Sequence, residues 1–276
     1  MRGKVKHTMV SVLLCGAMAL AGLQPCMPPA VQAAQGQEGT GQGKTGRAGR
    51  TDIDKSLIRA TAGSESAGEE AAKAVDGDPG TIWHSSWAEG HPTVPLSITL
   101  ELDEAKEGLT QLRYLPRQDV KGSNPQWNGD ILSYEVWVSS TDQQESSFQK
   151  VAVGDWAQDK EEKSATFAPV TAKYIRLTAT HTKGNNDVEY DQYASAAEIT
   201  LSCGGSVDLE GDRARLRAAL AKAKAYLEEA GAGNAEAINL QGLADWAAVL
   251  LQNQYAVAED LGIMAYSLLA ELERLQ

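Results

Sequence analysis

A short turn near residue 80 contains three side chains that could bind a cation. Asp76, Asp78 and Thr81 lie within six residues, and the Gly and Pro residues between them force the backbone to turn. Carboxylate and hydroxyl oxygens that converge from such a turn suit Ca²⁺, although the spacing is not that of an EF-hand. A tight Asp-Gly turn without an ion has the same composition. On spacing alone, the turn without an ion is the simpler interpretation.

A second group combines planar hydrogen-bonding side chains with aromatic rings. His84 and Trp87 follow the turn, and Arg117, Asn128 and Tyr193 come later in the chain. Arg presents parallel donors and Asn both donates and accepts, while a flat aromatic ring offers an apolar face on which a ligand can stack. Each polar residue also has a structural explanation: a core or surface histidine, an ion-paired arginine, and an Asn-Gly turn.

Catalytic motifs are absent from the sequence. It contains no nucleophile elbow, no His-Glu-x-x-His and no P-loop. Beyond residue 33 the histidines are His84, His91 and His181, and none has metal-ligand spacing to another. Carboxylate pairs at glycosidase separation could arise by chance among the many acidic residues. The sequence therefore predicts a non-catalytic protein.

Charge excludes some partners. The 276 residues include 37 acidic and 25 basic side chains, for a formal net charge of −12. An acidic surface repels nucleic acid and anionic membranes, so neither is expected as the main partner. A hydrophobic content of 42% is enough for a packed core.

The first 33 residues are expected to be a signal peptide, and the protein to be secreted. Basic residues at positions 2, 4 and 6 precede an uncharged apolar run over 9–23, and Val31-Gln32-Ala33 offers small residues for cleavage. A membrane anchor is the alternative, although the run is shorter than the roughly 20 residues that cross a bilayer. Cleavage would leave Cys203 as the only cysteine, without an internal disulfide partner.

The rest of the chain divides into three segments that differ in composition and hydrophobic pattern. Residues 34–51 are rich in glycine and are expected to be a flexible linker. Residues 52–204 contain short runs of alternating polarity over 96–102, 131–139 and 174–180, separated by Gly, Asn, Asp and Pro. Residues 207–276 carry three apolar stripes at helical spacing. We expect a β-sandwich followed by a separate three-helix bundle, with Trp246 in the bundle core.

Six motifs in the sandwich segment occur in the order of a known family. The segment resembles the discoidin, or coagulation-factor type C, fold, and more narrowly the family 32 carbohydrate-binding modules of secreted bacterial glycosidases. The helical segment resembles, more loosely, the FIVAR modules that accompany such domains. The motifs are AVDGDPGTIWHS (74–85), YLPRQ (114–118), NGDI (128–131), YEV (134–136), YIRL (174–177) and ASAAEI (194–199).

This resemblance implies a jelly-roll sandwich with a structural Ca²⁺ and a sugar site. It adds Glu198 and the carbonyl of Ala197 to Asp76, Asp78 and Thr81 as calcium ligands. His84, Arg117 and Asn128 would hold sugar hydroxyls, with Trp87 and Tyr193 as candidates for stacking and Trp83 in the core. The implied partners are glycans that bear galactose or N-acetylgalactosamine.

Other functions stay open at this point. The chain could be an extracellular adhesion or structural protein in which the helical bundle contacts other proteins. It could also be a non-catalytic fragment of a larger glycoside hydrolase. Phospholipid binding, as in animal relatives of the fold, is disfavoured by the acidic balance.

Overall fold

The computed structural model describes residues 49–121, 124–184, 189–231 and 237–276. The expected signal peptide (1–33) and most of the expected linker (34–51) lie outside these residues. Strand β1 (Arg50–Asp52) pairs with β11 (Glu198–Gly204), so the last two residues of the expected linker belong to the sheet. No helix in these ranges is long and apolar enough to cross a membrane.

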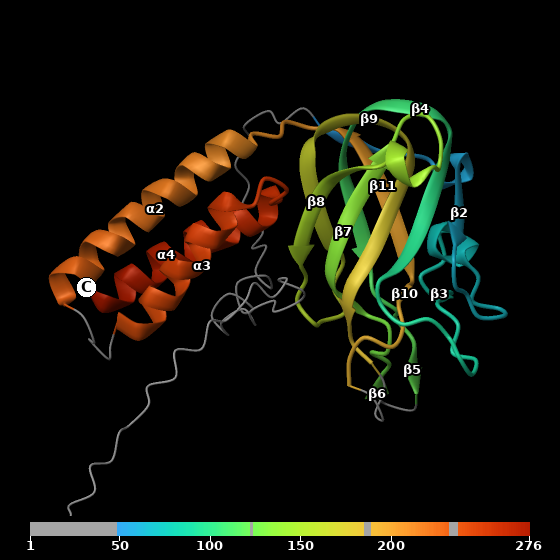
Figure 1. Ribbon diagram of the computed structural model, residues 1–276, viewed down its shortest axis with the longest axis horizontal. Helices are drawn as coiled ribbons and strands as arrows, with labels where there is room; N and C mark the ends of the chain where they lie inside the picture. Colours follow the sequence, from blue (N-terminus) through green and yellow to red (C-terminus); the bar gives the residue numbers. More distant parts are fainter. Residues whose placement is uncertain (1–48, 122–123, 185–188, 232–236) are drawn as a thin grey trace, which may run out of the picture.

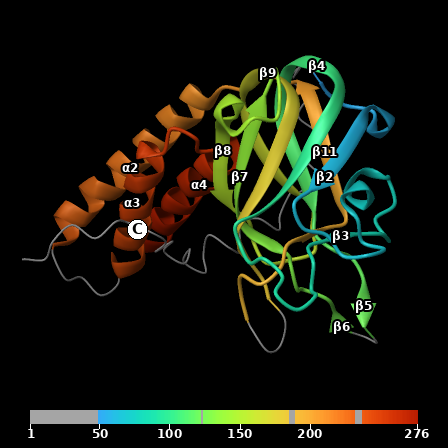
Figure 2. The ribbon, with the colours of Figure 1, turned by 45° about the vertical axis from the view of Figure 1, so that its right-hand side comes forward.

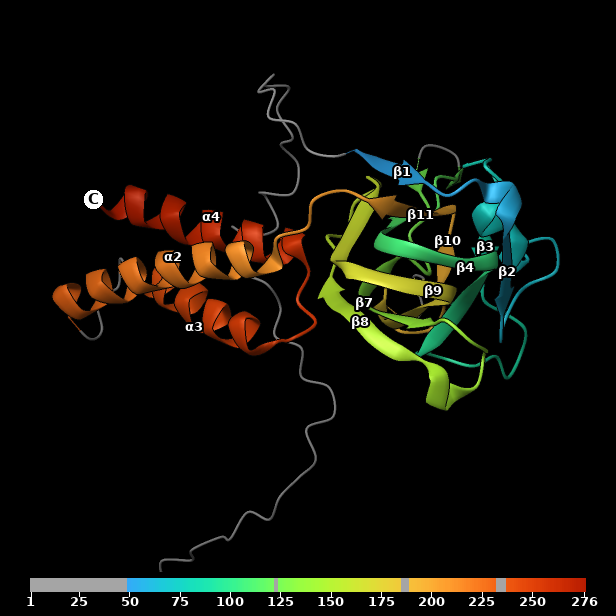
Figure 3. The ribbon, with the colours of Figure 1, turned by 90° about the horizontal axis from the view of Figure 1, so that it is seen from above.

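One antiparallel sheet folds over on itself to make both layers of the sandwich (Figures 1 and 3). Its long strands are β4 (Leu96–Leu115) and β9 (Lys163–Thr182), and their register shifts midway, where both bend. The strand order is β1-β11-β4-β9-β7-β8, with β2 paired to β4. The remaining bounds are β2 Ile58–Ala62, β7 Ile131–Ser139 and β8 Gln149–Asp155.

The core follows from the alternation seen in the sequence. Leu96, Ile98, Leu100 and Leu102 are all buried, because successive side chains of a strand point to opposite faces. Trp83 is also buried, as predicted. The β-sandwich prediction is thereby confirmed.

Three helices follow the sandwich and pack on one another (Figure 1). They are α2 (Leu209–Ala230), α3 (Ile238–Gln252) and α4 (Ala258–Leu275). The side chain of Asp208 accepts from the N–H of Gly211 and caps α2. Leu216, Leu243 and Leu268 lie in the shared core, and Trp246 packs against it partly buried.

The bundle docks on the sandwich through the start of α4. Val257, which precedes α4, is buried in the sandwich core and not in the core of the bundle. The N–H of Val153 in β8 donates to the carbonyl of Tyr255 at 3.1 Å. The connection between α3 and α4 therefore extends the edge of the sheet.

Candidate functional site

Hydrogen bonds bring His84, Asn128 and Arg117 together. They lie next to the short strand β3 (Trp83–His84), which Figure 2 labels below β2. Strands β3 (Trp83–His84) and β10 (Ser195–Ala196) pair, with Ser195 opposite His84. The N–H of Ser195 also donates to the carbonyl of Gly129 at 2.8 Å, which fixes the turn that carries Asn128. Gly129 has a φ of 89°, and a Cβ there would lie 2.9 Å from the nitrogen of Ser195. Only glycine allows this close approach.

A hydrogen-bonded chain joins His84, Asn128 and Arg117. The amide nitrogen of Asn128 lies 3.2 Å from Nε2 of His84, and its amide oxygen accepts from Nη1 of Arg117 at 3.0 Å. Nδ1 of His84 lies 2.7 Å from the carbonyl of Ser85. Because a carbonyl only accepts, Nδ1 carries the proton and Nε2 accepts from Asn128.

Burial favours this neutral form of His84. Loss of hydration lowers the pKa of the imidazole below 6.5, and the positive charge of Arg117 lowers it further. The backbone contact to Ser85 and the carboxylates of Glu69 and Asp119 act in the opposite direction. At neutral pH the imidazole therefore acts as an uncharged link in the chain.

Arg117 is largely buried and held by a carboxylate that the sequence analysis missed. Nε and Nη2 donate to the two oxygens of Asp119 at 2.6 and 2.7 Å, a bidentate pair. Arg117 thereby lowers the pKa of Asp119. The Arg-x-Asp spacing was a visible signal, since a carboxylate two residues away can reach the guanidinium.

The two predicted stacking residues are placed differently. Trp87 is 61% exposed, and its indole N–H donates to Oε2 of Glu69 at 3.3 Å. Tyr193 is only 8% exposed and packs between His84 and His91, with ring centroids 5.3 and 4.8 Å away. Of the two predicted stacking residues, Trp87 is therefore the one that presents an accessible aromatic surface. No sequence pattern singled out Glu69.

An ion pair between Lys160 and the buried Asp130 lies next to the turn that carries Asn128. Nζ of Lys160 donates to Oδ2 of Asp130 at 2.5 Å and lies 4.2 Å from the ring centroid of Trp127. Burial raises the pKa of Asp130 to about 7, although Lys160 and Arg117 oppose the shift. Neither Lys160 nor the ion pair was predicted, because the two residues are 30 positions apart.

The turn over 76–81 is held by its own polar groups. Oδ1 of Asp76 accepts from the N–H of Asp78 at 2.9 Å, and Oδ2 accepts from the hydroxyl of Thr81 at 2.8 Å. Oδ1 of Asp78 accepts from the N–H of Gly80 at 2.9 Å. These are the contacts of an Asx-type turn.

The expected calcium residues from β11 lie next to a lysine. Glu198 forms an ion pair with Lys55 through Oε2, and its other carboxylate oxygen, Oε1, is buried without a hydrogen-bond donor. The negative charge of Asp76 also acts on Lys55. Ala197 is buried and donates its N–H to the carbonyl of Leu115 at 2.9 Å. Within the described ranges, no three His, Cys, Asp or Glu side chains form a metal-binding group.

Comparison with known proteins agrees with this architecture. The family model described as F5/8 type C domain matches residues 59–199, about half of the chain. This protein therefore belongs to the F5/8 type C domain family. None of the comparisons supports the expected FIVAR likeness of the helices.

Curated relatives match the sandwich segment. Galactose oxidase of Gibberella zeae is 34% identical over 150 residues, which are 54% of this chain and 20% of the relative. The A type blood N-acetyl-α-D-galactosamine deacetylase of Flavonifractor plautii is 33% identical over 162 residues, which are 57% of this chain and 19% of the relative. The chain thus spans about a fifth of the length of these proteins.

Solved structures match the same segment. The family 32 carbohydrate-binding module of Clostridium perfringens NanJ, in complex with galactose, is 28% identical, with 55% of this chain and 98% of that one covered and a TM-score of 0.46. A C. perfringens module in complex with GalNAc-β-1,3-galactose is 31% identical, with 55% and 99% covered and a TM-score of 0.46.

Proposed function

We propose that this protein is a secreted, non-catalytic carbohydrate-binding protein that recognises terminal galactose or N-acetylgalactosamine residues of glycans. The site is the sandwich end that carries His84, Trp87, Arg117, Asn128 and Tyr193. The observation that carries the proposal is the His84–Asn128–Arg117 hydrogen-bonded chain beside the exposed ring of Trp87.

Such an arrangement suits a sugar. The hydrogen-bonded chain fixes the donors and acceptors before a ligand arrives, which lowers the entropic cost of binding. The indole offers a flat apolar face to the C–H bonds of a ring. The names of two relatives, galactose oxidase and N-acetyl-α-D-galactosamine deacetylase, support galactose-type sugars as the class.

The test is a glycan-array screen of the protein from residue 34 to residue 276, in calcium. The bundle stays in the protein because Val257 belongs to the sandwich core. We expect a selective signal on glycans that end in galactose or N-acetylgalactosamine. A silent array, or a signal confined to another sugar class, would overturn the proposal.

Two variants locate the site. Trp87→Ala removes an exposed ring, so it should abolish the signal while leaving the melting temperature unchanged. Arg117→Ala should also abolish it, but leaves Asp119 without its partner and needs a melting curve alongside. Arg59→Ala is the matched control, because the exposed Arg59 on β2 forms an ion pair with Glu101 on β4. Unchanged binding by Trp87→Ala and Arg117→Ala would contradict the site assignment.

A structural Ca²⁺ is part of the proposal. The residues that would hold it are Asp76, Asp78, Thr81, Glu198 and the carbonyl of Ala197. Their oxygens are hard donors of the kind that calcium prefers. Fit is supported by the oxygen-rich turn of Asp76, Asp78 and Thr81 and by the unpartnered Oε1 of Glu198. The ammonium of Lys55, which pairs with Glu198, would have to move away when the ion binds. The ion would tie the first turn to the last strand.

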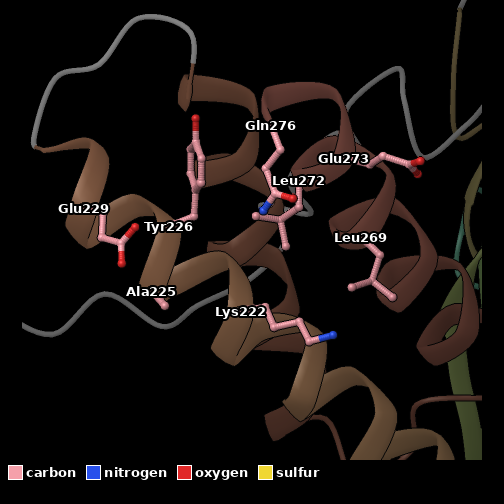
Figure 4. Close-up of a pocket in the computed structure, with 8 residues that line it drawn as sticks. All are labelled: Lys222, Ala225, Tyr226, Glu229, Leu269, Leu272, Glu273 and Gln276. Atoms are coloured by element: carbon pink, nitrogen blue, oxygen red, sulfur yellow. The ribbon is translucent and has the colours of Figure 1, made fainter.

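A second candidate function lies with the bundle. A cavity of about 420 Å³ opens between α2 and α4, and Leu269 and Tyr226 supply part of its apolar wall (Figure 4). Ile238, Val249 and Tyr266 are large apolar side chains exposed elsewhere on the helices. These features favour contacts with another protein. A silent glycan array together with a partner whose binding is lost in Leu269→Glu would support this function over the first.

A further inference from the structure

Glu69 lies at the edge of the proposed sugar site and has no counterpart in the sequence expectations. Its carbonyl accepts the N–H of His84 at 3.0 Å, which holds its backbone against β3. Its carboxylate accepts the indole N–H of Trp87 at 3.3 Å and acts on His84 electrostatically. The carboxylate is thus placed between the buried imidazole and the exposed indole.

The other charges near this point are paired. Arg117 forms an ion pair with Asp119, and burial keeps His84 neutral. Across the described ranges, Glu69 takes part in no ion pair within 4.0 Å. A half-exposed carboxylate without a cationic partner therefore gives the site a local negative charge.

A ligand cation would complete this arrangement. A protonated amine beside Glu69 would gain a charge-assisted hydrogen bond. An anionic sugar, such as a sialylated or sulfated one, would meet repulsion at the same place.

We propose that the site selects hexosamines with a free amino group, and that Glu69 is the residue that recognises the ammonium. This inference rests on the proposed sugar-binding function and narrows its ligand class. The acetylated and the hydroxylated sugars of the same ring would bind through the shared contacts alone, without the ion pair.

The test compares three methyl glycosides that differ only at C2: galactosamine, N-acetylgalactosamine and galactose. Titration calorimetry of the protein from residue 34 to residue 276, at pH 6 and low salt, should rank galactosamine first. Its advantage should be about tenfold, as expected for one hydrogen bond to a charged group. The advantage should shrink in about 0.5 M NaCl, because salt screens an exposed ion pair.

Glu69→Gln keeps the shape and the hydrogen bond from Trp87 but removes the charge. It should lower the affinity for galactosamine to that for galactose, and leave the affinity for galactose unchanged. Glu104→Gln is the matched control, since Glu104 is an exposed carboxylate paired with Lys106 between the two halves of β4.

The outcomes separate the two proposals. If galactose and galactosamine bind equally in the wild-type protein, or if Glu69→Gln weakens all three sugars alike, the ammonium proposal is wrong while sugar binding stands. If none of the three sugars binds, both proposals are overturned.

Discussion

The carboxylate of Glu259 accepts two hydrogen bonds from Thr166, one from the backbone N–H at 3.0 Å and one from the hydroxyl at 2.5 Å. Glu259 lies in the first turn of α4, and Thr166 lies in β9. A negative charge is also favoured at a helix N-terminus. This pair joins the bundle to the sandwich beside the buried side chain of Val257.

Removal of this carboxylate should loosen the docking of the bundle. Glu259→Ala is expected to lower the free energy of unfolding by at least about 1.5–3 kcal/mol, the value for a single hydrogen bond to a charged group, because it removes two such bonds. Thermal denaturation measures the loss, and X-ray scattering should show a wider spread of shapes. Glu228→Ala, an exposed site on α2, serves as the control. Equal effects of the two variants would argue against the role given to Glu259.

Gly154 in β8 packs closely against α4, so a larger side chain there tests the same interface. A Cβ at Gly154 would lie 2.7 Å from Oδ2 of Asp260 and 2.9 Å from the hydroxyl of Tyr134, which is closer than real Cβ contacts. Gly154→Ala should therefore push α4 away and lower the melting temperature. Hydrogen exchange should then increase at the start of α4.

Gly242 provides the matched control for that variant. It lies inside α3 with no atom within 4 Å of an added Cβ. Gly242→Ala should stabilise the protein by roughly 0.5–1 kcal/mol, because alanine loses less conformational freedom in a helix. Destabilisation by both variants would mean that the clash at Gly154 is not the cause.

The contribution of Asp130 to the free energy of unfolding should fall as the pH rises towards neutrality. The pKa of Asp130 is about 7 in the folded protein because of burial, against an ordinary value of 3.8. Between these pH values the folded state binds more protons than the unfolded state. The stabilisation that protonated Asp130 gives the folded state is therefore present at low pH and lost above about pH 7. Burial also raises the pKa of Asp155 and Asp260, with the same sign.

Asp130→Asn isolates that contribution. The amide cannot ionise, so the decline in melting temperature between pH 5 and pH 8 should be shallower than in the wild-type protein. The slope is the readout, because loss of the ion pair with Lys160 can shift the whole curve. The same slope in both proteins would show that Asp130 is not protonated in the folded state near pH 6.

Calcium should raise the melting temperature if the proposed cation site binds it. Mass action gives about 2.7 kcal/mol of added stability at a hundredfold excess over the dissociation constant. Chelation should reverse the rise, and Glu198→Gln should abolish it. Glu101→Gln is the control, because Glu101 lies in the first half of β4, whereas Glu198 pairs with Leu115 at the end of that strand. No shift with millimolar calcium would remove the ion from the proposal and leave the Lys55–Glu198 pair as the link between turn and strand.

Local patterns predicted the elements, and the family motifs predicted which loops converge. Leu96, Leu100 and Ile175 revealed their strands because alternation is a local property. His84, Arg117 and Asn128 came together through the order of the motifs, since no local rule joins residues that far apart. Their placement in one hydrogen-bonded chain agrees with that expectation.

The unpredicted contacts depend on the folded arrangement. Glu69 lies in a Gly- and Ser-containing loop without periodicity, and Lys160 meets Asp130 across 30 residues. The helical bundle was expected to be separate from the sandwich, yet Val257 from the bundle segment packs into the sandwich core. Such contacts depend on how strands and helices dock, and a one-dimensional pattern does not contain that information.

The docked position of Val257 also has a geometric consequence for a bound protein. Helix α2 has 22 residues, which span roughly 33 Å at 1.5 Å per residue. A tethered bundle would sample every direction around its anchor, whereas one fixed at Val257 and Glu259 points along a single axis. A glycan held at the site of His84 and Arg117 would then fix the orientation of the helices as well as their location.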